Sequence, residues 1–248
     1  MKISIITISY NSSQTIAETI QSVLRQDYEA VEYIIIDGQS TDNTDEIIRS
    51  YCDRISNYIS EKDNGIYDAM NKGIQNANGD IIGFLNADDL YARNNILSKV
   101  VQIFKEKNID SCYGDLVYVD GNDKNKVIRY WKSGFFDRSK FQFGWMPPHP
   151  TFFVKKKIYK KYGLFNTDLD IASDYELMLR FLFKNGISTH YIPDVLVKMR
   201  IGGVSNKSLK NLIRKTTQDY MAWKLNNMKG AALAIPLKNF RKIAQFFN

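Results

Sequence analysis

The sequence predicts an α/β fold in which a mostly parallel sheet is covered by helices on both faces. Short apolar runs alternate with helical patterns over the first 85 residues, as they do when parallel strands are joined by crossover helices. The runs are apolar throughout, which is typical of strands buried on both faces of a sheet. The chain of 248 residues is long enough to bury a full core around such a sheet.

The expected elements of the first half follow one another in regular order. Apolar residues at positions 16, 20, 23 and 24 share one face of a helix. Each predicted strand ends in polar residues that begin the next connection. The strands are expected at 3–8, 31–36, 55–60 and 81–85, with helices around 16–24, 47–51 and 66–77 between them.

The second half is expected to be less regular. Residues 111–120 and 126–131 are typical of a β-hairpin. Ser173 and Glu176 have the spacing of a capping box at the start of a helix. The remaining expected elements are a strand at 151–154, a helix at 174–184, a strand at 190–199 and a basic helical tail.

The positive charge is concentrated at the end of the chain. The protein has a net charge of +7, and residues 205–248 hold nine Lys or Arg and one acid, a net of +8 that leaves −1 for residues 1–204. A basic tail favours an anionic surface such as a membrane or nucleic acid, although a solvated helical face has the same composition. We expect one domain over 1–204, followed by a helical appendage over 205–248.

The cysteines and the apolar runs indicate the cellular compartment in which the protein is expected. Cys52 and Cys112 form neither a disulfide framework nor a metal-binding spacing, so we interpret them as free thiols in a reducing compartment. The apolar run at 3–8 is too short for a signal peptide, and no stretch is long enough to span a bilayer. These features predict a cytoplasmic protein.

Polar clusters follow three of the expected strands directly, at 7–11, 37–42 and 86–89. Ligands of open parallel sheets bind beyond the carboxyl ends of the strands, so these clusters are expected to meet in one crevice. Asp88 and Asp89 offer the hard oxygen ligands that Mg²⁺ and Mn²⁺ prefer. The alternative is that either residue caps the next helix.

Four further residues have side chains suited to such a site. Asp37 is suited to accept hydrogen bonds from a ribose or a base, or to form a turn. Asp174, in the first turn of a helix, is suited to act as a general base, or to interact favourably with the helix dipole. Arg200, before the glycines at 202–203, suits a diphosphate, or is a surface residue before a turn. His149, which lies between prolines, is suited to orient an acceptor, or is a loop histidine whose hydrogen bonds are made within the protein.

Five segments occur in a specific order and spacing along residues 1–204. They are Ile5–Asn11, Ile35–Thr44, Gly65–Ile74, Gly79–Asp89, and Ser173-Asp174 with Arg180. Together they resemble the family 2 glycosyltransferases, which are inverting enzymes of the GT-A fold, and within that family the bacterial transferases that build capsule, colanic-acid-like or O-antigen polysaccharides. The resemblance implies that residues 1–110 bind a nucleotide sugar and that residues 111–204 bind the acceptor.

The resemblance also implies a role for each matching residue. Asp88 would bind Mn²⁺ or Mg²⁺, and Asp174 would be the catalytic base. The chain departs from the family pattern at Asn86, which stands at the first acidic position of the metal motif, and at Ser173, where an acid usually precedes the base. The donor-binding residues would be Thr7, Tyr10, Asn11, Asp37, Asp63, Asn86, Asp89 and Arg200, with Asp89 as second metal ligand or support, and the acceptor-binding residues would be Trp145, His149 and Arg180.

The resemblance therefore implies an inverting glycosyltransferase that moves a sugar from a nucleotide-sugar donor to a saccharide or polyprenyl-linked saccharide acceptor. UDP is the expected nucleotide from its frequency in the family, with GDP and dTDP as alternatives. One other candidate function is nucleotidyl transfer to sugar phosphates, although residues 10–13 lack the glycines and basic residues of such enzymes. Another is a non-enzymatic protein that binds nucleic acid or a membrane. The near-neutral body argues against nucleic acid as a partner.

The tail has an amphipathic pattern that suits an interfacial helix on an anionic membrane. Such a helix would place the enzyme at the inner face of the membrane, beside a lipid-linked acceptor. The alternative is a helix packed on its own domain or on a second subunit. The apolar residues of this face are Leu237, Phe240, Ile243, Ala244 and Phe247, with Lys238, Arg241 and Lys242 nearby.

Overall fold

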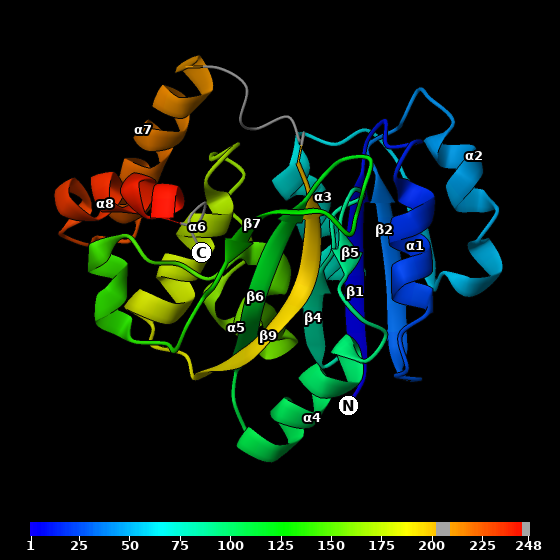
Figure 1. Cartoon of the computed structure of the whole chain (residues 1–248), viewed down its shortest axis with the longest axis horizontal. Helices are drawn as coiled ribbons and strands as arrows, with labels where there is room; N and C mark the ends of the chain where they lie inside the picture. Colours follow the sequence, from blue (N-terminus) through cyan, green and yellow to red (C-terminus); the bar gives the residue numbers. More distant parts are fainter. Residues whose placement is uncertain (202–208, 245–248) are drawn as a thin grey trace.

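A mixed nine-stranded sheet runs through the centre of the part of the chain that the structure describes (Figure 1). The structure is a computed structural model that describes residues 1–201 and 209–244, with side chains described for 1–201 and 213–241. The strands pair in the order β3-β2-β1-β4-β8-β6-β9-β5, and β7 pairs with β6. Their bounds are β1 (Ile3–Ser9), β2 (Val31–Asp37), β3 (Asn57–Ser60), β4 (Ile81–Phe84), β5 (Leu90–Tyr91), β6 (Ser111–Val119), β7 (Val127–Trp131), β8 (Phe153–Lys155) and β9 (Thr189–Arg200).

Helices cover both faces of this sheet (Figure 1). The helices α1, α2 and α4 bury their apolar residues on one face, and α3, α5, α6, α7 and α8 on the other. Their bounds are α1 (Ile16–Leu24), α2 (Thr44–Arg49), α3 (Ile66–Asn76), α4 (Ile96–Lys107), α5 (Lys156–Tyr162), α6 (Ser173–Met178), α7 (Leu209–Leu225) and α8 (Ala231–Ala244), with 3₁₀ turns η1 (Cys52–Arg54), η2 (Arg138–Phe143) and η3 (His149–Thr151). A π-helical segment, η4 (Leu179–Lys184), continues α6.

The first half confirms the predicted parallel sheet. The strands β3, β2, β1 and β4 are parallel, and the register places Ser9 beside Asp37 and Asp37 beside Ser60. The carboxyl ends of these strands therefore lie together at one edge. The parallel series ends at β8, which is antiparallel to both β4 and β6. The predicted hairpin is also confirmed, because β6 and β7 pair in antiparallel fashion.

The predicted capping box at the start of α6 is wrong. The N-cap position is Ala172, and no side chain caps the helix. The hydroxyl of Ser173 has no hydrogen-bond partner among the described residues. Glu176 forms an ion pair with Arg180 instead of reaching back to the start of the helix. The charged partner one turn later attracts the carboxylate more strongly than a backbone N–H does.

The tail helices are part of the core. Trp223 in α7 and Ile235 in α8 are buried in the same apolar cluster as Met70 of α3. Gly144, which follows η2, permits the close approach of α8, because a Cβ at this position would clash with the backbone of Lys238. The described part of α8 therefore packs on its own domain, which was the alternative to an exposed membrane helix.

The expected membrane face of α8 is partly contradicted. Lys238 is buried and forms an ion pair with Asp219 of α7 (2.7 Å), so it does not accompany an exposed apolar face. Phe240 is 68% exposed, whereas Leu237 is half-buried. Among the described helices, none combines the length and the apolar composition that a membrane crossing needs. The side chains of Lys242, Ile243 and Ala244, the residues Gly202, Gly203 and Phe247, and the expected domain boundary at 204 lie outside the described residues.

Candidate active site

Asp37 joins the carboxyl ends of β1, β2 and β3. Its side chain is fully buried, and Oδ1 accepts hydrogen bonds from Ser9 Oγ (2.9 Å) and Ser40 Oγ (2.6 Å). Oδ2 accepts hydrogen bonds from Ser40 N (2.9 Å) and Ser60 Oγ (2.9 Å). A carboxylate offers about four acceptor positions, so protein donors fill them in this conformation. The predicted ribose or base contact would require one serine hydroxyl to turn away.

Asn11 connects the loop after β1 to the loop after β2. Its N–H donates to Ser40 Oγ (2.8 Å), and its Oδ1 accepts from the N–H of Thr41 (2.8 Å). Its φ of 47° lies in the left-handed region, which Asn adopts more readily than most residues. Asn11 thus shapes the rim of the predicted nucleotide site.

Tyr10 and Asp63 meet beside Gly38. A Cβ at Gly38 would lie 2.5 Å from Asp63 Oδ2 and 3.4 Å from the Tyr10 ring, so the glycine allows both to come close. The Tyr10 ring is 62% exposed, and Asp63 is half-buried. An exposed aromatic ring beside a carboxylate suits a nucleotide base, because bases stack on aromatic rings and donate N–H groups.

Asp88 and Asp89 lie in the short connection between β4 and β5. Asp89 is fully buried; its Oδ2 accepts from Asn86 Nδ2 (2.8 Å), whereas its Oδ1 has no partner among the described residues. Burial raises the pKa of Asp89 well above its usual range, and the charge of Asp88 raises it further. Burial also raises the pKa of Asp88, and the charge of Arg200 opposes that rise. A divalent cation bound here would supply further positive charge beside both carboxyls.

A complete metal cage is not present in the described residues, where no group of three or more His, Cys, Asp or Glu side chains is placed to hold an ion. Mg²⁺ usually needs fewer protein ligands, because one or two carboxylates share it with waters and substrate phosphates. Asp88 and Asp89 match that simpler requirement.

Arg200 ends β9 and reaches the metal motif. Its Nη1 donates to the backbone carbonyl of Asp88 (3.4 Å), and its Nη2 pairs with Glu18 Oε2 (2.7 Å). Lys124 pairs with the same Glu18 carboxylate (3.0 Å). Arg200 therefore lies beside Asp88, with part of its guanidinium held by Glu18 of α1, and its contact with a diphosphate stays a prediction.

Asp174 lies half-buried in the first turn of α6. Its Oδ1 accepts from the N–H of Tyr175 (2.8 Å) and lies 3.3 Å from the hydroxyl of Tyr67, which belongs to α3. The same hydroxyl is 3.1 Å from the carbonyl of Ile171. In the described residues Oδ2 accepts no hydrogen bond, so one oxygen is free to take a proton.

Tyr118 of β6 is influenced by the charges of carboxylates from two distant motifs. Burial raises the pKa of Tyr118, and the guanidinium of Arg129, 3.7 Å from its ring, opposes the rise. The charges of Asp89 and Asp174 both raise this pKa further. Tyr118 is therefore exposed to the charge of a carboxylate from each half of the chain.

Arg180 does not face the site, which contradicts the predicted acceptor contact. Its guanidinium donates to both oxygens of Glu176 (2.9 and 2.8 Å) and to the carbonyls of Tyr162, Gly163 (3.0 Å) and Leu164 (2.7 Å). An arginine has five N–H donors, and all are used within the protein. Arg180 holds the end of α5 against α6.

The side chains of Trp145 and Thr7 are also turned away from solvent, which contradicts the predicted ligand contacts. Trp145 is buried, and its Nε1 donates to the carbonyl of Ser133 (2.8 Å). Thr7 is fully buried, with Oγ1 3.1 Å from the hydroxyl of Tyr33. Each side chain packs in the core, and its polar atom is already hydrogen-bonded within the protein.

His149 lies close to Asp174 but within the core. Its ring packs between Phe84 and Phe165, with both ring centroids at 5.5 Å. Burial lowers the pKa of His149, and the charge of Asp174 opposes this fall. The imidazole packs on two aromatic rings in the core near Asp174. An acceptor contact by His149 therefore stays a prediction.

Comparison with known proteins identifies a family. Residues 4–165 match the family model described as glycosyl transferase family 2. The chain belongs to glycosyl transferase family 2. An uncharacterized glycosyltransferase of Rickettsia typhi is 30% identical over 209 residues, which cover 80% of this chain and 64% of that protein. The chain spans only 34% of the length of a second relative, from Rickettsia felis.

Solved structures show the same fold as this family 2 chain. TarS of S. aureus in complex with UDP-GlcNAc is similar over 100% of this chain and 72% of its own, with a TM-score of 0.71 and 18% identity. The mannosyltransferase PcManGT of Pyrobaculum calidifontis in complex with GDP-Man and Mn²⁺ is similar over 98% of this chain and 74% of its own, with a TM-score of 0.64 and 17% identity. At these identities the likeness concerns the fold, which is the GT-A fold that the sequence predicted.

Three residues of this family 2 site were missed by the sequence analysis. Tyr67 lies within the third family motif and contacts Asp174, so its position in the motif was a signal. Tyr118 lies in the predicted hairpin, where nothing in the pattern distinguishes it from a packing residue. Glu18 lies on the exposed side of α1, and only the fold brings it to Arg200.

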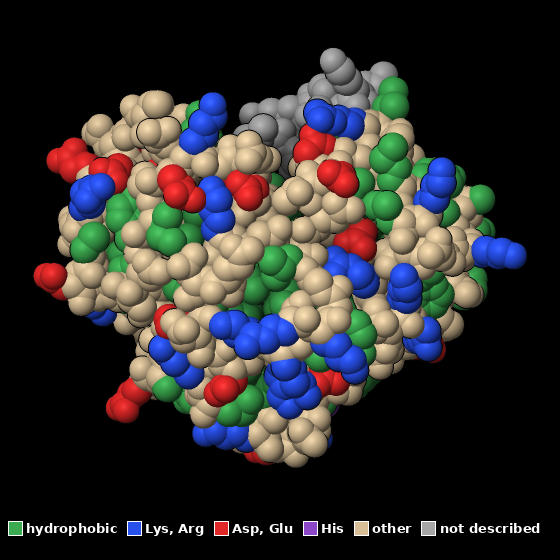
Figure 2. Space-filling model, turned by 180° about the vertical axis from the view of Figure 1, so that it is seen from behind, with side chains coloured by type: hydrophobic (Ala, Val, Ile, Leu, Met, Phe, Trp, Pro, Cys, Tyr) green, Lys and Arg blue, Asp and Glu red, His purple; other side chains and the backbone are tan. Residues whose placement is uncertain are grey.

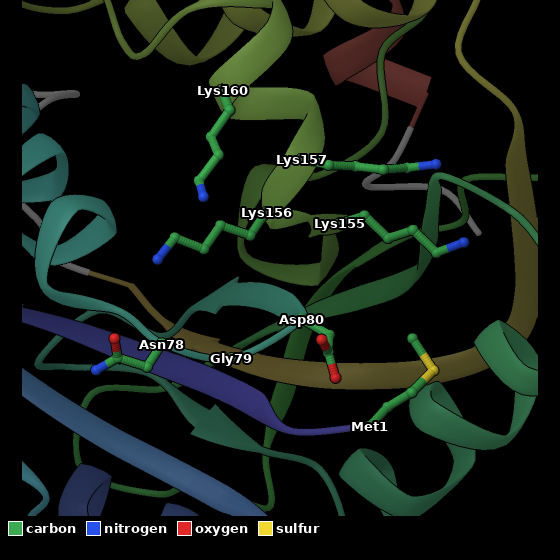
Figure 3. Close-up of a pocket in the computed structure, with 8 residues that line it drawn as sticks. All are labelled: Met1, Asn78, Gly79, Asp80, Lys155, Lys156, Lys157 and Lys160. Atoms are coloured by element: carbon green, nitrogen blue, oxygen red, sulfur yellow. The ribbon is translucent and has the colours of Figure 1, made fainter.

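The family 2 chain also has a basic hollow of about 570 Å³ at the opposite edge of the sheet, beside the amino ends of β1 and β4 (Figure 3). Lys156 already donates to the carbonyl of Ala77, and Lys157 pairs with Asp110 (3.0 Å). Seen from behind, Lys and Arg side chains gather in the lower half of the molecule (Figure 2). The hollow contains none of the predicted site residues; it is lined by Met1, Asn78, Gly79, Asp80, Lys155, Lys156, Lys157 and Lys160.

Proposed function

We propose that the chain is an inverting glycosyltransferase that moves a sugar from a nucleotide-sugar donor to an acceptor hydroxyl, with Asp174 as the general base. The observation that carries the proposal is the contact of Asp174 Oδ1 with the hydroxyl of Tyr67 (3.3 Å), because it joins the proposed base to α3 in the nucleotide half of the chain. The charges of Asp89 and Asp174, which both raise the pKa of Tyr118, agree with this placement. A donor-side acidic pair and a separate proton acceptor are the groups that such a displacement needs. Asp174 lies beyond the matched family segment, which ends at residue 165.

We place the donor nucleotide at the carboxyl ends of β1 and β2, where Tyr10, Asp63 and the loop at Asn11 lie together. UDP is the first candidate, since TarS has been solved with UDP-GlcNAc, and GDP is the second, since PcManGT has been solved with GDP-Man. A thermal-shift panel of UDP-, GDP- and dTDP-sugars with Mn²⁺ tests this proposal. One nucleotide class should raise the melting temperature; no shift with any of them would contradict a nucleotide-sugar site.

The end of β4 fits a divalent cation. The unpartnered Asp89 Oδ1 and the raised pKa values of both carboxyls are what an acidic pair shows before a cation neutralises it. Asp88, the more exposed of the two, would hold Mn²⁺ or Mg²⁺, with Asp89 as second ligand or support. When bound, the cation would supply positive charge to the diphosphate leaving group.

Replacing Asp88 by Asn should remove the effect of Mn²⁺ on donor binding. Because Asn keeps the shape but not the charge, we expect the affinity for the nucleotide sugar selected in the panel to fall by about tenfold or more in Mn²⁺ and to become insensitive to EDTA. Calorimetric titration measures this. The matched control is Asp168→Asn, an exposed carboxylate away from the motif. Unchanged Mn²⁺-dependent affinity in Asp88→Asn would remove the metal assignment.

The proposed reaction is a single displacement. The acceptor hydroxyl gives its proton to Asp174, whose Oδ2 is free of other hydrogen bonds among the described residues. At the same time the oxygen of the acceptor hydroxyl attacks the anomeric carbon. The bond from that carbon to the diphosphate breaks, and the nucleoside diphosphate leaves from the opposite face. The configuration at the anomeric carbon is inverted, so an α-linked donor gives a β-linked product. Tyr67 holds the other carboxylate oxygen in place.

We propose that the acceptor is a saccharide or a polyprenyl-linked saccharide of a bacterial surface polysaccharide, approached with the help of peripheral membrane contact. Phe240 of α8 is 68% exposed and supports this contact. Phe240→Ser should lower co-sedimentation with phosphatidylglycerol vesicles severalfold, because the apolar anchor is lost. The control is Val127→Ser, an exposed apolar residue of β7. Equal sedimentation of all three proteins would rule out anchoring by this helix; deletion of α8 is unsuitable because it packs in the core.

A further inference from the structure

The loop that carries the proposed base lacks a capping group of its own. Residues 170–172 lead into α6, a helix of six residues. Asp174 accepts from the N–H of Tyr175 in the first turn, but the N–H groups of Ile171 and Ala172 precede the helix and have no acceptor within it. Ala172 at the N-cap has no side chain to accept from them, and Ser173 and Glu176 do not do so either. The acceptor must come from elsewhere in the chain.

Gln218 of α7 supplies that acceptor. Its Oε1 accepts hydrogen bonds from the N–H of Ile171 (2.9 Å) and the N–H of Ala172 (3.2 Å). Its Nε2 donates to Asp170 Oδ1. Gln218 is only 9% exposed, so solvent does not easily replace these bonds. One side chain therefore holds three consecutive residues, 170–172, which end two positions before the base.

The same face of α7 makes two more polar contacts with α6. Trp223 Nε1 donates to the hydroxyl of Tyr175 (2.9 Å), and Asn226 Nδ2 donates to Glu176 Oε1 (2.9 Å). Tyr175 and Glu176 follow Asp174 directly in the chain. The contacts of α7 thus lie on both sides of Asp174 but do not involve its carboxylate.

We propose that Gln218 is a positioning residue that fixes Asp174 for proton transfer, so that the C-terminal helix α7 is a working part of the active site. This proposal rests on the proposed role of Asp174. It extends the functional unit past residue 165, where the family match ends. General base catalysis depends on geometry at the level of about 1 Å, and an uncapped loop does not hold such geometry.

Gln218→Met keeps the length of the side chain and removes all three hydrogen bonds. We expect kcat for nucleoside diphosphate release to fall by about tenfold or more, while the Kd of the nucleotide sugar selected in the panel stays within about twofold. We also expect faster hydrogen–deuterium exchange in the peptide that spans 168–178, because the N–H groups of Ile171 and Ala172 lose their acceptor. The control is Met221→Gln, an exposed position of the same helix, which should match the wild type in all three measurements.

A double variant that restores the hydrogen bonds distinguishes a positioning role of Gln218 from a general effect on stability. The double variant Asp170→Asn, Gln218→Glu exchanges the donor and the acceptor between the two side chains and keeps an oxygen for both backbone N–H groups. It loses only the exposed ion pair of Asp170 with Arg214, which is worth little. We expect it to recover kcat and slow exchange relative to Gln218→Met.

Two results would overturn the proposal: wild-type kcat and exchange in Gln218→Met, or a fall in donor affinity as large as the fall in kcat, which would indicate general unfolding. Failure of the proposed function would give a different result. Asp174→Asn would then retain turnover, whereas Gln218→Met would still show faster hydrogen–deuterium exchange in the peptide 168–178. Loss of turnover in Asp174→Asn with normal kcat in Gln218→Met would sink only the positioning role.

Discussion

Asp174→Asn is expected to lower the rate of sugar transfer by about 10²- to 10⁴-fold, the usual contribution of a general base, while donor affinity stays within about twofold. Asn has the shape of Asp and keeps an oxygen for the N–H of Tyr175 and the hydroxyl of Tyr67. It does not accept a proton at neutral pH. The fold and the donor site are therefore preserved, and only the deprotonation of the acceptor is lost.

The measurement is nucleoside diphosphate release from the nucleotide sugar that stabilises the wild-type chain most, together with calorimetric titration of the same donor. Asp168→Asn, which removes an exposed carboxylate six residues earlier in the chain, should behave as the wild type. Turnover near the wild-type level in Asp174→Asn would assign the base to another group.

Lys238→Met is expected to lower the free energy of unfolding by about 3–5 kcal/mol, because it leaves a buried charge without its partner. Lys238 and Asp219 are 5% and 1% exposed, and the second oxygen of Asp219 already has no partner among the described residues. The ammonium also lies 3.3 Å from the ring centroid of Tyr175, so its loss removes a cation–π contact.

Denaturant unfolding with and without the partner substitution tests this result. Asp219→Leu combined with Lys238→Met should recover most of the lost stability, since an apolar pair of similar volume replaces a buried ion pair at little cost. Lys224→Met, at an exposed position of α7, should change the free energy by less than about 0.5 kcal/mol. A small effect of Lys238→Met alone would mean that Asp219 becomes protonated or solvated instead of remaining a buried anion.

The parallel half of the sheet was predictable from local pattern. Its strands are rich in Ile, and three of the four end in a polar residue, Ser9, Asp37 or Ser60. The adjacent placement of these residues follows from pairing strands that all end at one edge. Parallel order then placed the polar clusters together, as the general rule for such sheets requires. The short antiparallel β8 was harder to place, because the first expected residue, Thr151, ends the 3₁₀ turn η3 and the strand begins only at Phe153.

The roles of single side chains were less predictable, because they depend on partners far away in the chain. The predicted capping box does not form, because Glu176 pairs with Arg180 instead. The predicted acceptor contact of Arg180 is not seen, because the carbonyls at 162–164 accept hydrogen bonds from its guanidinium. The tail was predicted from its charge, yet Lys238 is buried because a single acid, Asp219, faces it. A composition count does not reveal such a pairing.

Asp37 has a consequence for the thermodynamics of donor binding. Its four hydrogen bonds unite three strand ends and the loop that begins at Ser40 before any ligand arrives. The conformational entropy of ordering this rim has thus been spent during folding, so little of the donor's binding energy is consumed in organising it.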